Sequence, residues 1–129
     1  MGYSPETLAA FHAAVENHTA PPRDVPHVVG HAGKPPGQGP FLRIYLVVED
    51  GVIRDAAHET YGCPACIACA HTVCELARGR TVKGARDIDQ AALTACVGQL
   101  PRQKRHCLGL AVGALRDALE KTRARSSEA

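Results

Sequence analysis

The sequence predicts an α+β domain in which a small antiparallel sheet of three strands packs against helices. Two alternating apolar segments, residues 41–48 and 52–60, flank the turn signal Glu49-Asp50-Gly51, which is the pattern of a β-hairpin. Apolar residues at helical spacing occur both before and after this hairpin. A helix, a small sheet and then further helices are typical of the α+β class.

The N-terminal part begins with helix signals. A cap residue, a proline and a carboxylate stand at positions 4–6, and they predict a helix over residues 5–17. Prolines and glycines are dense between His18 and Pro40, where Val28-Val29 alone suggests a short strand. We therefore expect a long irregular segment there, of the kind that is usually functional or mobile.

Helices are predicted after the hairpin. Pro64 marks the first turn of a helix that Cys63 would cap and that continues to Arg78 before Gly79. Two short helices follow, one over residues 81–87 and one over residues 89–96. Cys63 therefore stands at a junction between a strand and a helix.

The last helix begins near Lys104 or Arg105, and we expect it to dissolve in the charged tail from Lys121 to Ala129. We interpret residues 1–129 as a single domain, with disordered or mobile ends at about 1–4 and 122–129.

Composition limits the classes of function. The net charge of +2 and the 4% of aromatic residues argue against nucleic-acid binding. No segment approaches the apolar length of a membrane span, and the first residues do not have the pattern of a signal peptide. We therefore expect a cytoplasmic protein whose thiols stay reduced.

The cysteines carry the chemical signal. Four of the six lie at positions 63, 66, 69 and 74, and Cys107 directly follows His106. In a reducing compartment such a group indicates metal binding or sulfur chemistry rather than a disulfide framework.

Helical geometry indicates which of these thiols can bind one metal ion together. Cys66 is one turn beyond Cys63, so both sulfur atoms can reach one metal ion at the helix start. Cys69 lies about 600° of rotation from Cys63, which makes it the second choice. We interpret Cys74 and Cys96 as structural, because free cysteine is often a small buried hydrophobe, and we expect His71 to face solvent.

The motifs resemble those of the IscU / NifU N-terminal family. The resemblance lies in residues 46–56, in 59–63 with Tyr61-Gly62-Cys63, in 76–81, and in Leu100-Pro101 followed by His106-Cys107. It spans nearly the whole chain. It implies the small-sheet α+β fold of that family and the role of a scaffold for iron-sulfur cluster assembly, which is not an enzyme.

The chain departs from the family at one ligand loop. The family's first cysteine lies in a Gly-x-Pro-x-Cys-Gly-Asp loop, whereas residues 33–40 here read Gly-Lys-Pro-Pro-Gly-Gln-Gly-Pro, so that glycine replaces both the cysteine and the aspartate. The family cysteines and histidine that carry over are Cys63, His106 and Cys107. We therefore predict Cys63, Cys66, His106 and Cys107 as the ligands, with Cys69 as the alternative to Cys66.

The resemblance also implies a cargo and partners. The cargo would be a 2Fe-2S or 4Fe-4S cluster, or zinc in its place, and the lost aspartate predicts tighter retention. The partners would be a cysteine desulfurase, which delivers sulfur as a persulfide to Cys107, and apo iron-sulfur acceptor proteins. The family's Leu-Pro-Pro-Val-Lys motif recruits an Hsp70-type chaperone, but residues 100–104 keep only its ends and first proline, which argues against that partner.

Two other functions fit the cysteines. A thiol redox switch could use Cys63 and Cys66 at a helix start, although the thioredoxin-like motif normally follows a βαβ pattern. A structural zinc domain for protein interaction would need four closed ligands. A ferredoxin is disfavoured because the motif's Cys-Pro is missing after Cys69.

Overall fold

The computed structural model describes residues 3–18, 20–35 and 37–128, with side chains as far as residue 122. Along this part of the chain the elements are α1 (Pro5–Glu16), β1 (Val28–Gly33), β2 (Phe41–Glu49), β3 (Val52–Tyr61), α2 (Pro64–Ala77), α3 (Val82–Ala85), α4 (Gln90–Val97), a 3₁₀ turn (Arg102–Lys104) and α5 (His106–Glu128). The predicted α+β class is confirmed.

The described strands form one antiparallel sheet in the order β1-β2-β3. β2 and β3 are the predicted hairpin, and its turn places Asp50 at φ 53° and Gly51 at φ 75°, as a two-residue hairpin loop requires. Every second side chain of β2 is buried, namely Leu42, Ile44 and Leu46. One face of the sheet therefore belongs to the core.

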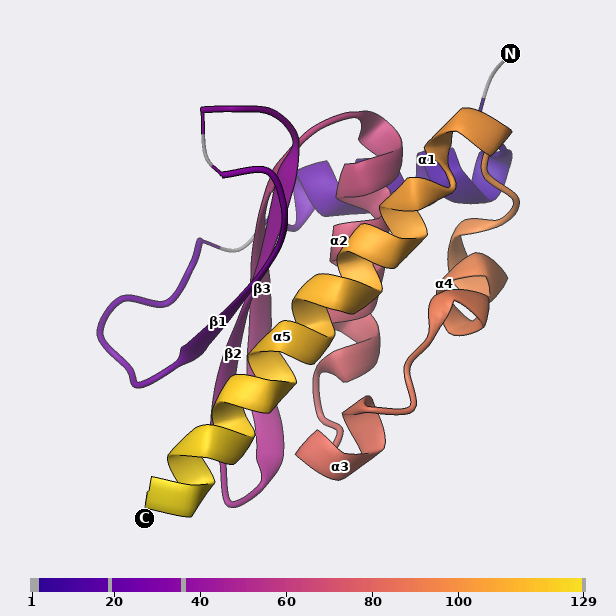
Figure 1. Ribbon diagram of the computed structural model, residues 1–129. Coiled ribbons are helices and arrows are strands. Elements are labelled where there is room, and N and C mark those ends of the chain that lie inside the picture. The colour runs from indigo at the N-terminus through magenta and orange to yellow at the C-terminus, as the bar shows by residue number, and fades with distance from the viewer. Residues whose placement is uncertain (1–2, 19, 36, 129) are drawn as a thin grey trace.

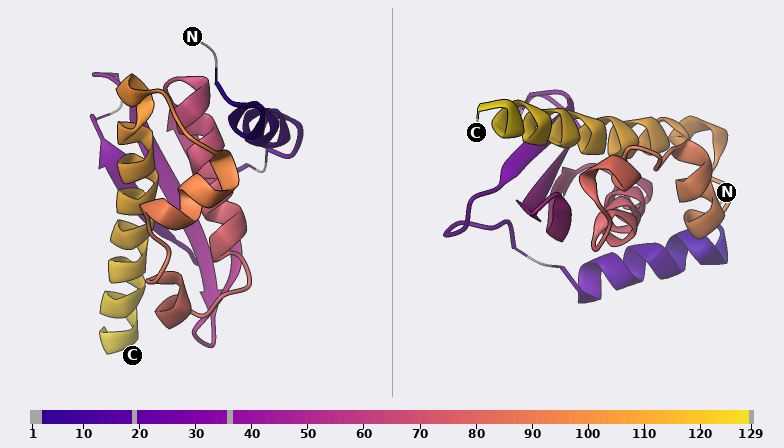
Figure 2. Two further views of the ribbon diagram at one scale, coloured as in Figure 1. Left: turned by 90° about the vertical axis from the view of Figure 1, so that its right-hand side faces the viewer. Right: turned by 90° about the horizontal axis from the view of Figure 1, so that it is seen from below.

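Helices α2 and α5 supply the other half of the core. α5 packs against β1 and β2, and α2 packs against β3, α1 and α5. Figure 1 shows α5 crossing the sheet with α2 beside it. Viewed from below, α2 lies between α5 and α1 (Figure 2, right). The start of α5 and the start of α2 thereby lie near the same end of the molecule (Figure 1).

Gly30 allows β1 to approach α5 closely. A Cβ atom at this position would lie 2.0 Å from the carbonyl oxygen of Ala114 and 2.4 Å from the amide nitrogen of Ala118. The backbones of the strand and the helix therefore touch with no side chain between them.

Two sequence expectations about elements need correction. The strand suggested at Val28-Val29 is present but longer than expected, since β1 runs from Val28 to Gly33 and pairs along β2, so that the segment from His18 to Pro40 is less irregular than predicted. α5 does not end near Lys121 but continues to Glu128, since the tail residues are mostly good helix formers. Of the ends that we expect to be mobile, positions 1, 2 and 129 lie outside the described residues.

Among the residues that the structure describes, no helix combines the length and the apolar character of a membrane span.

Candidate metal centre

Cys63 joins the sheet to α2. It is the N-cap residue of that helix, as predicted, with extended backbone angles, and Pro64 follows at the first helical position. Gly62 lies next to both Cys66 and Pro40, since a Cβ atom there would make ordinary contacts of 3.4 Å with Cys66 Sγ and 3.9 Å with Pro40 Cβ. The loop that ends at Pro40 therefore reaches the same place as the cysteines.

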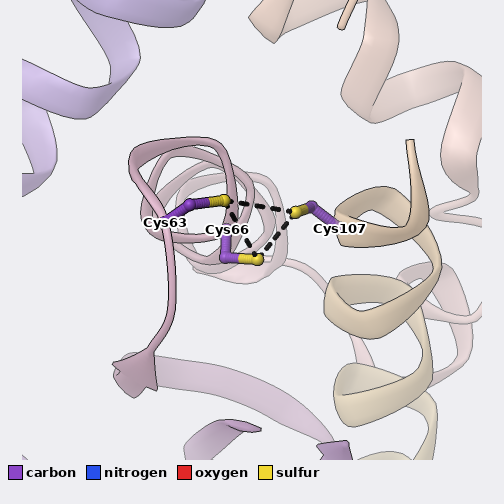
Figure 3. A group of neighbouring side chains, drawn as sticks. All are labelled: Cys63, Cys66 and Cys107. Carbon is purple, nitrogen blue, oxygen red and sulfur yellow. Dashed lines mark hydrogen bonds between the residues drawn. The ribbon is translucent and has the colours of Figure 1, made fainter. Parts of the chain in front are cut away.

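Cys107 reaches these thiols from α5. Its Sγ lies 2.6 Å from Cys66 Sγ and 3.9 Å from Cys63 Sγ, and the Cys63 and Cys66 sulfur atoms are 3.8 Å apart. Figure 3 shows the three side chains pointing toward one another from the starts of two helices. We name this group the thiol triad. Metal ligand atoms can come from cysteine, histidine, aspartate or glutamate. Within the described residues, the thiol triad is the one group in which three such atoms lie within 4.8 Å of one another.

The triad is graded in exposure. Cys63 is partly exposed, whereas Cys66 is 3% and Cys107 0% exposed. A reagent from solvent thus meets Cys63 first.

The two buried thiols share a hydrogen bond that shifts their pKa values in opposite directions. The bond with Cys107 lowers the pKa of Cys66 to about 6, against the opposing effect of burial. The same bond and burial raise the pKa of Cys107. The hydrogen bond between them therefore favours the thiolate form of Cys66 over that of Cys107.

His106 lies beside the triad but not in it. Its Nε2 is 3.8 Å from Cys107 Sγ, and its side chain is exposed. His106 is therefore outside the group of three ligand atoms that lie within 4.8 Å of one another.

Tyr3 is a neighbour of the triad that no sequence motif signals, because it is distant in the chain from Cys63. Its hydroxyl hydrogen-bonds to Cys63, and its pKa is raised by burial and then by the negative charge that Cys63 can carry. The ring packs against the core. The N-terminal segment therefore takes part in the surroundings of the exposed thiol.

The remaining cysteines do not belong to the triad. Cys69 and Cys74 are 0% and 2% exposed, and burial raises the pKa of each to about 12. Cys74 is in the core as predicted, whereas Cys96 is exposed, which contradicts its interpretation as a buried hydrophobe. Cys96 lies near the end of the short helix α4, whose buried side chains are Leu93 and Val97.

A polar cavity with histidines in its lining lies elsewhere in the molecule. It measures about 600 Å³, and its lining includes His18, His71 and Arg78. His71 is half-buried rather than solvent-facing. His58 is 8% exposed, and its ring lies 5.6 Å from that of His18. The cavity belongs to α2, β3 and the end of α1, and it is separate from the triad.

Comparison with known families gives one match over most of the chain. The family model described as NifU-like N terminal domain matches residues 11–129.

Curated relatives carry matching descriptions. Iron-sulfur cluster assembly scaffold protein IscU 1 of Archaeoglobus fulgidus is 38% identical over 110 residues, which cover 81% of this chain and 71% of the relative. Iron sulfur cluster assembly protein 1, mitochondrial, of Debaryomyces hansenii is 32% identical, with 94% and 72% covered. Iron-sulfur cluster assembly scaffold protein IscU of Aquifex aeolicus is 28% identical, with 85% and 74% covered.

Solved structures share the fold. A candidate iron-sulfur cluster assembly scaffold protein for the SUF system from Fervidobacterium islandicum superposes with a TM-score of 0.70 at 18% identity, covering 91% of this chain and 96% of that one. The N-terminal part of a nitrogen-fixing NifU-like protein from Brucella abortus gives a TM-score of 0.56 at 16% identity, covering 98% and 95%. At these identities the likeness concerns the fold alone.

Proposed function

Because the chain belongs to the family of NifU-like N-terminal domains, we propose that it is a scaffold or carrier for an iron-sulfur cluster. The cluster is its cargo, held by the thiol triad. Relatives described as assembly scaffolds, 38% and 28% identical to this chain, support this role.

The spacing of the sulfur atoms is the observation that carries the proposal. Two thiolates bound to one tetrahedral metal ion at about 2.3 Å lie about 3.8 Å apart. Cys63 stands 3.8 Å from Cys66 and 3.9 Å from Cys107. The Cys66–Cys107 pair, at 2.6 Å, needs to open by about 1 Å to reach the same spacing. A thiolate-rich donor set of this kind suits an iron-sulfur cluster, and it also suits zinc.

His106 is the proposed fourth ligand. It directly precedes Cys107 at the start of α5, and its exposed ring is free of the packing that holds the three thiols. Cys69 is a poorer choice than Cys66, because its sulfur atom does not belong to the group of three that lie within 4.8 Å of one another.

The site has thiolates where the family pattern has a carboxylate. Gly37 and Gly39 occupy the loop before β2 in which the resemblance places the missing cysteine and aspartate. We expect such a site to retain its metal more tightly than one with an oxygen ligand, since thiolates bind iron and zinc more strongly.

The proposed partners follow from the chemistry of assembly. A cluster needs sulfide, so a cysteine desulfurase is the proposed source of sulfur, and apo iron-sulfur proteins are the proposed acceptors. The proposed location is the cytoplasm, where thiols stay reduced.

Anaerobic purification followed by iron, zinc and acid-labile sulfide analysis tests the function. A scaffold yields brown protein with iron and sulfide, or forms a cluster when iron, sulfide and a reductant are added. Colourless protein with one zinc ion that chelators remove slowly would instead indicate a structural zinc module.

Matched serine variants test the ligand set. Cys66→Ser is expected to lower cluster yield strongly, whereas Cys69→Ser, one helical turn away, leaves it near the wild-type level. The reverse result would show that Cys69 is the ligand.

A further inference from the structure

The two buried thiols of the triad are closer to each other than either is to the third. Cys66 and Cys107 stand 2.6 Å apart, against 3.8 Å and 3.9 Å to Cys63. A disulfide bond is about 2.05 Å long, so this pair has to close by only about half an ångström. Of the three possible disulfides, Cys66–Cys107 needs the smallest change in sulfur–sulfur distance.

Within the triad, Cys63 is the thiol that a sulfur donor can reach. It is partly exposed, whereas Cys66 and Cys107 are 3% and 0% exposed. The resemblance implied Cys107 as the persulfide position, but its burial favours Cys63 as the point of entry. One reachable thiol thus lies in front of a buried dithiol.

Resting on the scaffold function proposed above, we propose that the buried Cys66–Cys107 pair reduces a persulfide carried by Cys63, releasing sulfide and closing a Cys66–Cys107 disulfide. The extra cysteine of the helix start, Cys66, would then supply electrons to the site as well as a ligand.

The first step moves the terminal sulfur inward. Cys66 thiolate attacks the outer sulfur atom of the Cys63 persulfide, a new bond forms between these two atoms, and the bond to Cys63 Sγ breaks, leaving a Cys63 thiolate. The 3.8 Å between Cys63 and Cys66 is slightly less than two S–S bond lengths, about 4.1 Å. A sulfur atom bound to Cys63 is therefore within bonding reach of Cys66.

The second step releases sulfide. Cys107 gives its proton to the Cys63 thiolate and attacks Cys66 Sγ, the Cys66–Cys107 bond forms, and hydrosulfide leaves. The transferred sulfur gains two electrons and the two thiols lose two, so the exchange balances without another reductant. The persulfide comes from a protein or low-molecular-weight persulfide donor, and a dithiol reductant reopens the disulfide before metal can bind.

A single-turnover experiment tests the proposal on the metal-free protein. The reduced chain is treated anaerobically with a low-molecular-weight alkyl persulfide, desalted at once, and followed with no reductant present. We expect about one sulfide released per chain and, in the peptides that carry the triad, a transient mass gain of one sulfur atom followed by a final loss of two hydrogen atoms. Peptide mapping is expected to find the Cys66–Cys107 disulfide.

Variants test whether sulfide release depends on the Cys66–Cys107 pair or can come from any thiol of the protein. Cys66→Ser is expected to lose the disulfide and to keep its sulfur as a persulfide, whereas Cys96→Ser, which removes the exposed cysteine of α4, behaves as wild type. A wild-type protein that keeps its persulfide, a disulfide that includes Cys63, or unchanged sulfide release from Cys66→Ser would each overturn the proposal. The wild-type mapping needs no substitution, so it decides the matter even if Cys66→Ser does not fold.

Cluster formation from iron salt and free sulfide distinguishes this proposal from the scaffold function. That reaction bypasses the persulfide. A wild-type chain that forms a cluster in this way but gives no Cys66–Cys107 disulfide would overturn the reduction step alone.

Discussion

Lowering the pH from 7 to 5 is expected to reduce the free energy of unfolding of the metal-free protein by about 2 kcal/mol through His58 alone. This side chain lies in β3, is 8% exposed, and hydrogen-bonds to Thr60. Burial first, and then repulsion from His18 and His71, lower its pKa from 6.5 to about 4. The folded state therefore holds His58 neutral at a pH where the unfolded chain protonates it.

The sign and size follow from this difference. The stabilising contribution is fully present above pH 6.5 and is lost as the pH falls from 6.5 toward 4. One pKa unit corresponds to about 1.4 kcal/mol, so the whole shift is worth about 3 kcal/mol. The interval from pH 7 to pH 5 covers somewhat more than half of that amount, about 2 kcal/mol.

Urea unfolding followed by circular dichroism measures the effect. Wild type, His58→Gln and the exposed control His12→Gln are each compared with themselves at pH 7 and pH 5. His58→Gln cannot titrate, so it should lose about 2 kcal/mol less than wild type over this interval, while His12→Gln should match wild type. Equal losses in wild type and His58→Gln would refute the burial argument.

Three further predictions concern packing and thiol access. Gly30→Ala is expected to lower the free energy of unfolding by about 3 kcal/mol or more, because the added Cβ atom has no room against α5. Gly113→Ala, whose Cβ atom would have its nearest contact 3.8 Å away, should be neutral or stabilise the protein by about 0.5 kcal/mol. Urea unfolding measures both variants, and equal effects would contradict the close approach of β1 to α5. Ser4→Ala removes the side-chain cap of α1 and should cost about 1 kcal/mol, which thermal unfolding detects as a lower Tm; an unchanged Tm would show that the cap is dispensable. Alkylation at pH 8 should label the exposed Cys96 rapidly and leave Cys69 unlabelled, since burial raises the pKa of Cys69 to about 12. Mass mapping that finds Cys69 modified in the folded protein would contradict the burial of this thiol.

Local sequence signals predict the elements next to the site. The hairpin turn at Asp50-Gly51 and the cap at Cys63 are both confirmed, because both depend on residues that are neighbours in the chain. The shared position of Cys63 and Cys66 at one helix start follows from helical geometry. The predicted β1 is too short, because a strand of mixed composition is stabilised by pairing with β2 rather than by its own residues.

Contacts between distant segments are beyond such signals. The exposure of Cys96, the burial of His58 and the contact of Tyr3 with Cys63 each depend on how separate elements pack. Composition assigns a residue type an average burial, and tertiary packing overrides that average at individual positions.

The sequence by itself determined the α+β class, the order of the elements and the placement of Cys63 and Cys66 at the start of α2, since these depend on local periodicity and on residue type. Only the tertiary structure decided that α5 brings Cys107 within 2.6 Å of Cys66 while leaving Cys63 as the most accessible thiol of the triad. The physical reason is that α2 and α5 pack on the same sheet with their starts at one end, an arrangement set by long-range burial of apolar surface and not by any neighbouring residue.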